Sequence, residues 1–199
     1  MRVVALAPEL EPAWADLFAA SSSGCYCRYW HFEGGKNDWL ARLAFAEGDN
    51  HAEQRALLLA GDDRARGVVA LEEAPEPQAQ AVAVGWMKLV PVAAVPKLRR
   101  LPVYRALSLG PEKGIWSVGC LLVRPTHRRR GVARALVLGA VAIAAGWGAS
   151  AVEAYPHRRG EALRDEEAWM GPLSLFEECG FSVVGGDLAY PVLRRVIGR

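Results

Sequence analysis

One stretch of the sequence constrains the fold more than any other, because it combines two long apolar runs with a short basic turn. Ile115–Val123 is almost unbroken in its apolar character, which predicts a strand buried on both faces. Val132–Trp147 suits a helix that is apolar almost all round and therefore mostly buried. Ser150–Tyr155 predicts the next strand. A strand, a buried helix and a second strand in succession predict a crossover unit packed on a sheet.

Three helices are expected before this unit. Apolar residues at helical spacing predict the first helix over Glu9–Ala20. A second helix is expected from Asn37 or Asp38, either of which can cap it, to about Ala46. The third is expected from a cap at Asn50 to about Ala60.

The remaining segments predict strands, turns and one short helix. The expected strands are Arg66–Leu71, Ala81–Val90, Phe181–Val184 and Leu188–Val196, the last two forming a hairpin. Glu72–Gln80 is expected to be a turn, Pro91–Gly110 a loop with short helical turns, Pro156–Met170 a loop and Pro172–Cys179 a helix. These elements predict an α/β (α+β) fold in one domain over residues 1–199, with a helical part at about 8–60 and a sheet core at about 66–196. An edge strand at Leu188–Val196 could pair across a homodimer.

Composition excludes several classes of protein. Hydrophobic residues make up 52% of the chain and charged residues 23%, as in globular domains. A net charge of +2 argues against a nucleic-acid partner.

The longest apolar stretch, Ala135–Gly148, is shorter than the roughly 20 residues of a membrane helix, and the N-terminal apolar run is too short for a signal peptide. We therefore expect a cytoplasmic protein with no membrane partner and reduced thiols. The cysteines at 25, 27, 120 and 179 lack zinc-site spacing, so no metal is predicted.

The turn between the apolar strand and the buried helix has the chemistry of an anion site. The first turn of a helix leaves backbone N–H groups without partners, and the helix dipole favours negative charge there. Gly131 lets the backbone approach a ligand closely, and Ala133 does nearly the same. Arg128, Arg129, Arg130 and Arg134 add positive charge, which suits a diphosphate. By spacing alone, a plain turn with solvated arginines explains these residues equally well.

Two motifs resemble a known family. Arg128-Arg129-Arg130-Gly131-Val132-Ala133 resembles the Arg/Gln-x-x-Gly-x-Gly/Ala motif of the GNAT superfamily of acyl-CoA-dependent N-acyltransferases. Leu175-Phe176-Glu177-Glu178-Cys179-Gly180-Phe181 resembles the family's Leu-Tyr-x-x-x-Gly-Phe signature. The resemblance implies a mixed, mostly antiparallel sheet flanked by helices, with a splayed strand pair at the cofactor site. It also implies an N-acetyltransferase that moves an acetyl group from acetyl-CoA, as co-substrate, to a primary amine by direct attack.

Carried over residue by residue, the resemblance assigns the binding of acetyl-CoA. The motif turn would hold the pyrophosphate, the edge of the preceding strand would meet the pantetheine arm, and the late helix would flank it. The residues so assigned are Leu121, Leu122, Val123, Arg128, Arg129, Arg130, Gly131, Val132, Ala133, Arg134 and Phe176.

The catalytic groups are less completely specified. A backbone N–H of the strand can polarise the carbonyl, and Leu122 is the expected donor. Phe176 stands where the family often has a tyrosine acid, so Ser174 is a candidate donor, or the thiolate leaves unassisted. The strand carries no glutamate base; Tyr155 could act through a water chain or be a plain wall residue. Cys120 could take the acyl group covalently or be inert.

The acceptor side is expected between three segments, Cys25–Phe32, Pro91–Arg105 and Pro156–Met170. The aromatic residues there either line a pocket or belong to the core; they are Tyr26, Tyr29, Trp30 and Trp86. Two rival functions stay open at this point. One is a catalytically silent acyl-CoA-binding sensor or partner module, and the other is a nucleic-acid contact through the basic turn.

Overall fold

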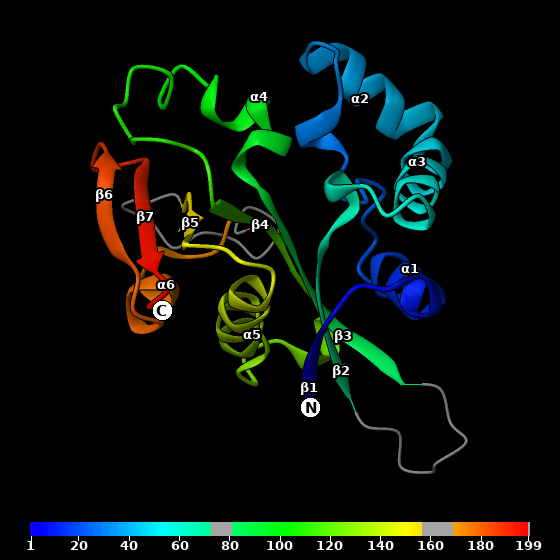
Figure 1. Ribbon diagram of the computed structural model, residues 1–199. Coiled ribbons are helices and arrows are strands. Elements are labelled where there is room, and N and C mark those ends of the chain that lie inside the picture. Colours follow the sequence, from blue (N-terminus) through cyan, green and yellow to red (C-terminus); the bar gives the residue numbers. More distant parts are fainter. Residues whose placement is uncertain (73–80, 157–168, 199) are drawn as a thin grey trace.

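A seven-stranded mixed sheet forms the centre of the computed structural model, which describes residues 1–72, 81–156 and 169–198 (Figure 1). The strand order is β1-β2-β3-β4-β5-β7-β6. Neighbouring strands are antiparallel except β4 and β5, which are parallel. The strands are β1 (Arg2–Ala5), β2 (Gly67–Glu72), β3 (Val82–Pro91), β4 (Ile115–Val123), β5 (Ala151–Ala154), β6 (Ser182–Gly186) and β7 (Pro191–Val196). The predicted fold class is confirmed.

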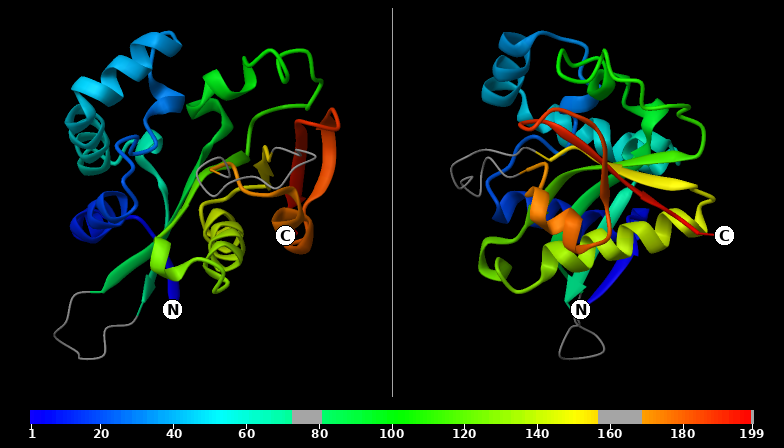
Figure 2. Two further views of the ribbon diagram at one scale, coloured as in Figure 1. Left: turned by 180° about the vertical axis from the view of Figure 1, so that it is seen from behind. Right: turned by 90° about the vertical axis from the view of Figure 1, so that its left-hand side faces the viewer.

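Helices cover both faces of the sheet. α1, α2 and α3 lie on one face, and α5 and α6 lie on the other (Figures 1 and 2). The α-helices are α1 (Glu11–Ala20), α2 (Lys36–Phe45), α3 (Glu47–Leu59), α4 (Pro96–Arg99), α5 (Val132–Gly146) and α6 (Leu173–Glu178). Short 3-10 turns are η1 (Pro8–Leu10), η2 (Tyr29–His31), η3 (Asp63–Ala65), η4 (Val92–Ala94) and η5 (Pro125–His127).

The sheet separates two hydrophobic cores, as its two helical layers require. On the α1 face, Trp14 and Phe18 pack with Trp86 of β3. On the α5 face, Leu136 and Val137 pack against the opposite sides of the same strands. In the described parts of the chain, no helix has the length and apolar character needed to cross a membrane.

The parallel pair of strands separates after a short pairing. The β4–β5 register runs from Ile115 opposite Ala151 to Ser117 opposite Glu153. Beyond Ser117, β4 has left β5, and its ladder up to Val123 is with β3 among the strands that the structure describes. A register shift interrupts the β3–β4 ladder in this region, and Cys120 has a left-handed φ of 49°. The predicted splay is therefore present, with a bulge in β4 at the same point.

Several elements differ from the sequence-based expectations. β1 was not predicted, because Arg2–Ala5 is too short to show a clear alternation. α3 starts at Glu47, so Asn50 is not a cap; it is fully buried and donates to the Gly24 carbonyl oxygen at 2.9 Å. Glu72, the first residue of the turn predicted over 72–80, belongs to β2 instead; the rest of that turn and most of the loop predicted over 156–170 lie outside the described residues.

The prediction of an edge strand at Leu188–Val196 was wrong. β7 lies between β5 and β6, so both of its edges are paired. The hairpin turn also comes later than expected, because Gly185 and Gly186 belong to β6. Asp187 then accepts backbone N–H groups of Ala189 and Tyr190 at 2.8 and 2.7 Å. A dimer through β7 is therefore excluded by the topology.

Candidate active site

The turn before α5 brings the basic motif residues to the start of a buried helix. Gly131 precedes the helix in the left-handed region, with φ 79°, and Arg129 is also left-handed, with φ 57°. Within α5 the N–H of Ala135 is bonded to the Gly131 carbonyl oxygen at 3.0 Å. The preceding N–H groups, of Val132 to Arg134, belong to the first turn, where helical donors have no intrahelical acceptor. The guanidinium-bearing residues around them are exposed: Arg128, Arg129, Arg130 and Arg134.

The open edge of β4 leads directly into this turn. Arg124 donates its backbone N–H to the Val84 carbonyl oxygen at 2.9 Å, so the N–H of this residue points toward β3. Successive N–H groups of a strand point to opposite sides, so Leu122 also faces β3, whereas Leu121 and Val123 face the open edge. Leu121 confirms the alternation by donating to the Trp169 carbonyl oxygen at 2.7 Å. Leu122, the carbonyl-polarising donor expected from the sequence, therefore has its N–H turned toward β3 and away from the open edge.

Residues 169–171 lie along the open edge where β4 has left β5. Besides the bond from Leu121 to Trp169, Met170 packs over Gly119, with its sulfur 3.6 Å from the place of an added Cβ. Met170 is buried. The segment therefore covers the inner half of the splay, between the end of the β4–β5 ladder and Leu121.

Tyr155 belongs to a buried ionic network at the end of β5. Its hydroxyl donates to Glu153 Oε2 at 2.5 Å and accepts from Arg99 Nε at 3.3 Å. Glu153 is fully buried and also binds Arg99 at 2.8 Å and Arg194 at 2.5 Å. Burial and the Glu153 charge raise the pKa of Tyr155 far above its usual range. The hydroxyl is thus held as a protonated donor to a carboxylate.

α6 places its two predicted site residues differently. Phe176 is buried, packs on Phe181 with ring centroids 5.4 Å apart, and lies against Gly171. It therefore supports the segment that covers the open edge of β4. Ser174 is exposed on the same short helix.

A small cavity lies beside β4 on the α1 face of the sheet. It draws residues from all three segments predicted to wall the acceptor side, namely Trp30, Val95 with Leu98, and Met170. β3 and β4 provide the rest of its lining, which is Lys88, Val90, Ser117, Val118 and Gly119. The three segments predicted from the sequence thus meet at one point, next to the bulge of β4.

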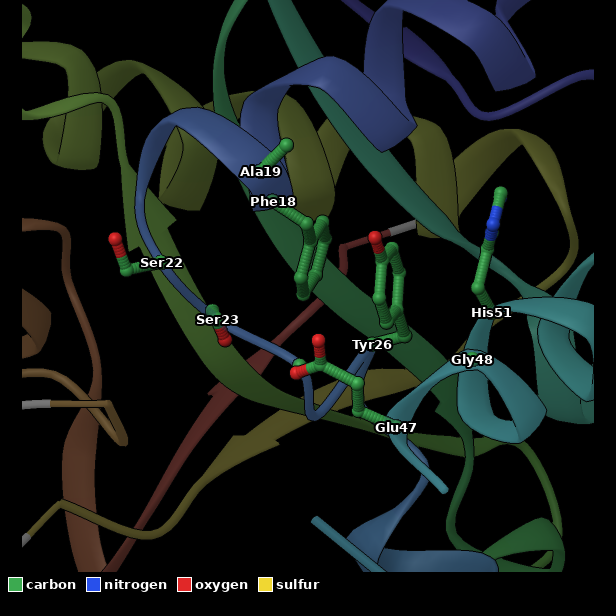
Figure 3. A pocket seen from close by; sticks show the side chains of 9 residues that line it. Phe18, Ala19, Ser22, Ser23, Tyr26, Glu47, Gly48 and His51 are labelled. Carbon is green, nitrogen blue, oxygen red and sulfur yellow. The ribbon is translucent and has the colours of Figure 1, made fainter. Parts of the chain in front are cut away.

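Two open hollows lie outside this cavity. One, of about 460 Å³, shares Trp30 with the cavity and is rimmed by charged side chains of Arg64, Lys97 and Arg100. The other, of about 450 Å³, lies between the end of α1 and the start of α3 (Figure 3). In Figure 3 the rings of Phe18 and Tyr26 lie side by side, and the carboxylate of Glu47 lies below them in this view.

The aromatic residues divide between core and pocket. Trp86 is fully buried and donates its indole N–H to Cys27 Sγ at 3.0 Å, so it belongs to the core. Trp30 is 5% exposed but borders both the cavity and one hollow. Tyr26 borders the other hollow. Trp86 is therefore a core residue, whereas Trp30 and Tyr26 border two different hollows.

Sequence reasoning missed Lys88. This residue interrupts the apolar pattern of β3 and is 2% exposed, and it lines the cavity. The available signal was its place: a lysine between Met87 and Leu89 in a predicted strand that is otherwise largely apolar there. Buried lysines are rare and need compensation, so this position called for an explanation.

A mixed sheet with one separating parallel pair, followed by a glycine turn and a buried helix, is the architecture that the family resemblance implied for an N-acyltransferase. The model of the acetyltransferase (GNAT) family matches residues 14–165. The chain therefore belongs to the GNAT acetyltransferase family. No curated protein matches it.

Solved structures share the fold at low sequence identity. The PaiA N-acetyltransferase of Thermoplasma acidophilum, in complex with coenzyme A, has a TM-score of 0.53 at 13% identity, covering 99% of this chain and 100% of that one. An aminoglycoside 6'-acetyltransferase type Ii has a TM-score of 0.53 at 16% identity, covering 100% and 99%. A GNAT-family acetyltransferase of Brucella melitensis, in complex with acetyl-CoA, has a TM-score of 0.51 at 16% identity, covering 100% and 88%.

Proposed function

We propose that the protein transfers the acetyl group of acetyl-CoA to a primary amine by direct attack. The observation that carries the proposal is the continuity of the site: the open edge of β4 runs from Leu121 through Val123 into the turn at Gly131. A thioester bound along this edge would place its phosphates at the N-terminus of α5, where free N–H groups and the helix dipole favour anions. Structures of similar fold contain coenzyme A or acetyl-CoA.

In this proposal the residues of the turn bind the pyrophosphate. Backbone N–H groups of Val132, Ala133 and Arg134 face it, and Gly131 leaves room for close approach, because nothing lies within 4 Å of the place of its Cβ. The exposed guanidinium groups of residues 128–130 and 134 supply the compensating charge. Val123 and Leu121 pair with the pantetheine arm, and Phe176 supports this edge from behind.

The Leu121 N–H polarises the thioester carbonyl. In the structure this donor binds the Trp169 carbonyl oxygen at 2.7 Å, so the donor is held in place and is satisfied by an acceptor of the same chemical kind. Acetyl-CoA would replace one carbonyl oxygen by another at this position, and the N–H would then stabilise the oxyanion formed on attack. The thiolate leaves either unassisted, since thiol pKa values near roughly 8.5 make it a fair leaving group, or with a proton from Ser174.

Incubation of the purified protein with acetyl-CoA and a panel of primary amines tests the proposal, with the acetylated product measured by mass. We expect at least one amine to be acetylated by the wild type and the rate to fall at least tenfold in Arg130→Glu at limiting acetyl-CoA. The exposed Arg105→Glu provides the control for charge reversal elsewhere on the surface. Binding of acetyl-CoA without turnover of any amine would instead support a silent acyl-CoA-binding module.

A further inference from the structure

Lys88 is buried at the centre of the sheet, beside the place where the acyl group would react. It lies opposite Gly119 in the β3–β4 register, and it is 2% exposed. Its side chain is on the α1 face, where it lines the small cavity together with Ser117, Gly119 and Met170. The cavity has a volume of about 10 Å³, room for one water molecule, which could relay a proton between Lys88 and an amine at the thioester.

Two residues that line the cavity are close in the chain to the proposed carbonyl-polarising N–H of Leu121 or to its acceptor. Met170, which lines the cavity, follows Trp169, whose carbonyl oxygen binds the Leu121 N–H. Gly119, which also lines it, precedes Leu121 by two residues on β4. Lys88 and the Leu121 N–H thus lie on opposite sides of one short stretch of β4, one facing the acceptor side and the other facing the open edge.

Compared with bulk water, the surroundings of Lys88 favour the uncharged form of its own side-chain amine. Its Nζ donates to the Arg64 carbonyl oxygen at 2.7 Å. Burial lowers the pKa of Lys88 to about 8, the thiols of Cys27, Cys120 and Cys25 raise it, and the charge of Arg28 lowers it. His31 also lies within the field of Lys88, whose charge lowers the pKa of that imidazole. Near pH 8 about half of the Lys88 side chains are therefore neutral.

Cys27 gives Lys88 a partner that can hold negative charge. Its sulfur accepts the indole N–H of Trp86 at 3.0 Å and a hydrogen bond from the Cys120 thiol. Burial raises the pKa of Cys27, but these two hydrogen bonds and the charges of Lys88 and Arg28 outweigh it, so its pKa is lowered overall. A proton received by Lys88 would therefore be stabilised by the neighbouring sulfur.

We propose that Lys88 is the general base of acetyl transfer, a role that rests on the proposed function. The nitrogen of the acceptor attacks the thioester carbonyl carbon, so that a C–N bond forms and the C–S bond breaks. The nitrogen loses its proton to a water in the cavity as that water passes a proton to the uncharged Nζ of Lys88, which becomes an ammonium group. The electron pair of the broken bond leaves with coenzyme A as its thiolate, which takes up a proton to become the thiol, and Lys88 returns its own proton to solvent.

The ionisation of Lys88 can be measured without any acceptor. The chain has four lysines, Lys36, Lys88, Lys97 and Lys113, so selective ¹³C labelling of lysine gives a small set of NMR signals, and Lys88→Arg identifies the one of interest. We expect this signal to titrate with a midpoint near pH 8, and at lower pH in Cys27→Ser, because the Cys27 sulfur raises the pKa of Lys88. A midpoint at the ordinary lysine value of about 10.4 would overturn the proposal.

Kinetics test the role itself. The probes are acetyl-CoA with phenethylamine, spermidine and glycine ethyl ester, and kcat/KM, calculated for the uncharged amine so that the amine's own ionisation cancels, is measured from pH 6 to 9.5 with the fastest of the three. In the wild type kcat/KM should rise to a plateau with a midpoint near pH 8. Lys88→Met should lower it by about 10²–10⁴-fold, remove this midpoint and leave acetyl-CoA binding unchanged, whereas exposed Lys113→Met should match the wild type.

These outcomes distinguish a failure of the role of Lys88 from a failure of the proposed acetyl transfer. A wild type that acetylates a probe, together with a Lys88→Met variant within about threefold of it and with the same pH profile, overturns the role of Lys88 alone. A wild type that fails to bind acetyl-CoA, or that acetylates none of the probes, overturns the role of Lys88 as general base and counts against the proposed function as well. Cys27→Ser, which keeps Lys88, should move the midpoint of the kcat/KM profile to lower pH, and an unmoved midpoint would show that the profile does not report Lys88.

Discussion

At the residue scale, Gly131 has the most specific backbone requirement in the site. Its φ of 79° is costly for any residue with a Cβ, by roughly 1–2 kcal/mol. We therefore expect Gly131→Ala to lower the free energy of unfolding by about 1 kcal/mol, as measured by urea denaturation. Gly146→Ala, at the other end of α5 and with nothing near its added Cβ, is the control and should be neutral or stabilising. Equal stability of Gly131→Ala and wild type would show that the turn is not strained.

Tyr155 allows a structural role to be separated from a catalytic one. Tyr155→Phe removes the hydroxyl that binds Glu153 and Arg99 but leaves Glu153 paired with both arginines. We expect a loss of about 1–2 kcal/mol in the free energy of unfolding, with kcat/KM within about threefold of the wild type. Thermal denaturation and the acetylation assay measure the two effects. A large loss of activity at unchanged stability would favour the water-chain role that the sequence left open.

At the scale of elements, the packing of α5 on β3 fixes the position of the turn. Gly85 lies beneath the helix, and an added Cβ there would come within 2.6 Å of Val132 and 2.9 Å of Leu136. Val132 follows Gly131 directly, so a larger side chain at position 85 that displaces Val132 would also shift the start of α5. We expect Gly85→Ala to cost about 1–3 kcal/mol of stability, measured by urea denaturation, and also to weaken acetyl-CoA binding severalfold. Unchanged binding would mean that the turn is positioned independently of this contact.

The elements themselves were predictable where long patterns support them. β4, the turn and α5 follow from two apolar runs and a glycine, and α1 follows from its helical spacing. β1 was missed because four residues carry no periodicity. The order of the last two strands was mistaken because local patterns do not contain strand pairing. The place of β7 between β5 and β6 follows from its pairing with both of these strands, which the structure shows.

The candidate site was predictable in its cofactor half and much less so in its acceptor half. The motif residues lie on one turn because they are consecutive in the chain. Leu121 rather than Leu122 faces the open edge because of how β4 pairs with β3, which depends on residues 30–40 positions away. Lys88, Cys27 and Cys120 come together from three distant segments, and nothing in the local sequence of any one of them indicates the other two.

At the scale of the whole molecule, the half-buried imidazole of His31 links stability to pH. Burial, with the charges of Lys88 and Arg28, lowers the pKa of His31 to about 2, against about 6.5 in an unfolded chain. Between these values the unfolded state binds more protons, so stability rises with pH and is lost as pH falls below about 6.5. We expect the urea midpoint to fall between pH 7.5 and 5.5 more in the wild type than in His31→Leu. Equal slopes would show that His31 titrates normally.

Calorimetric titration of acetyl-CoA into the folded protein, with Arg130→Glu and Gly131→Asp as variants and Arg105→Glu as the surface control, decides whether the turn at the start of α5 is the cofactor site. Saturable one-to-one binding by the wild type and Arg105→Glu, weakened at least tenfold in both turn variants, is the expected result. Equal binding by all four proteins would move the cofactor away from the turn. A folded wild type that binds no acetyl-CoA would contradict the proposed acetyl transfer.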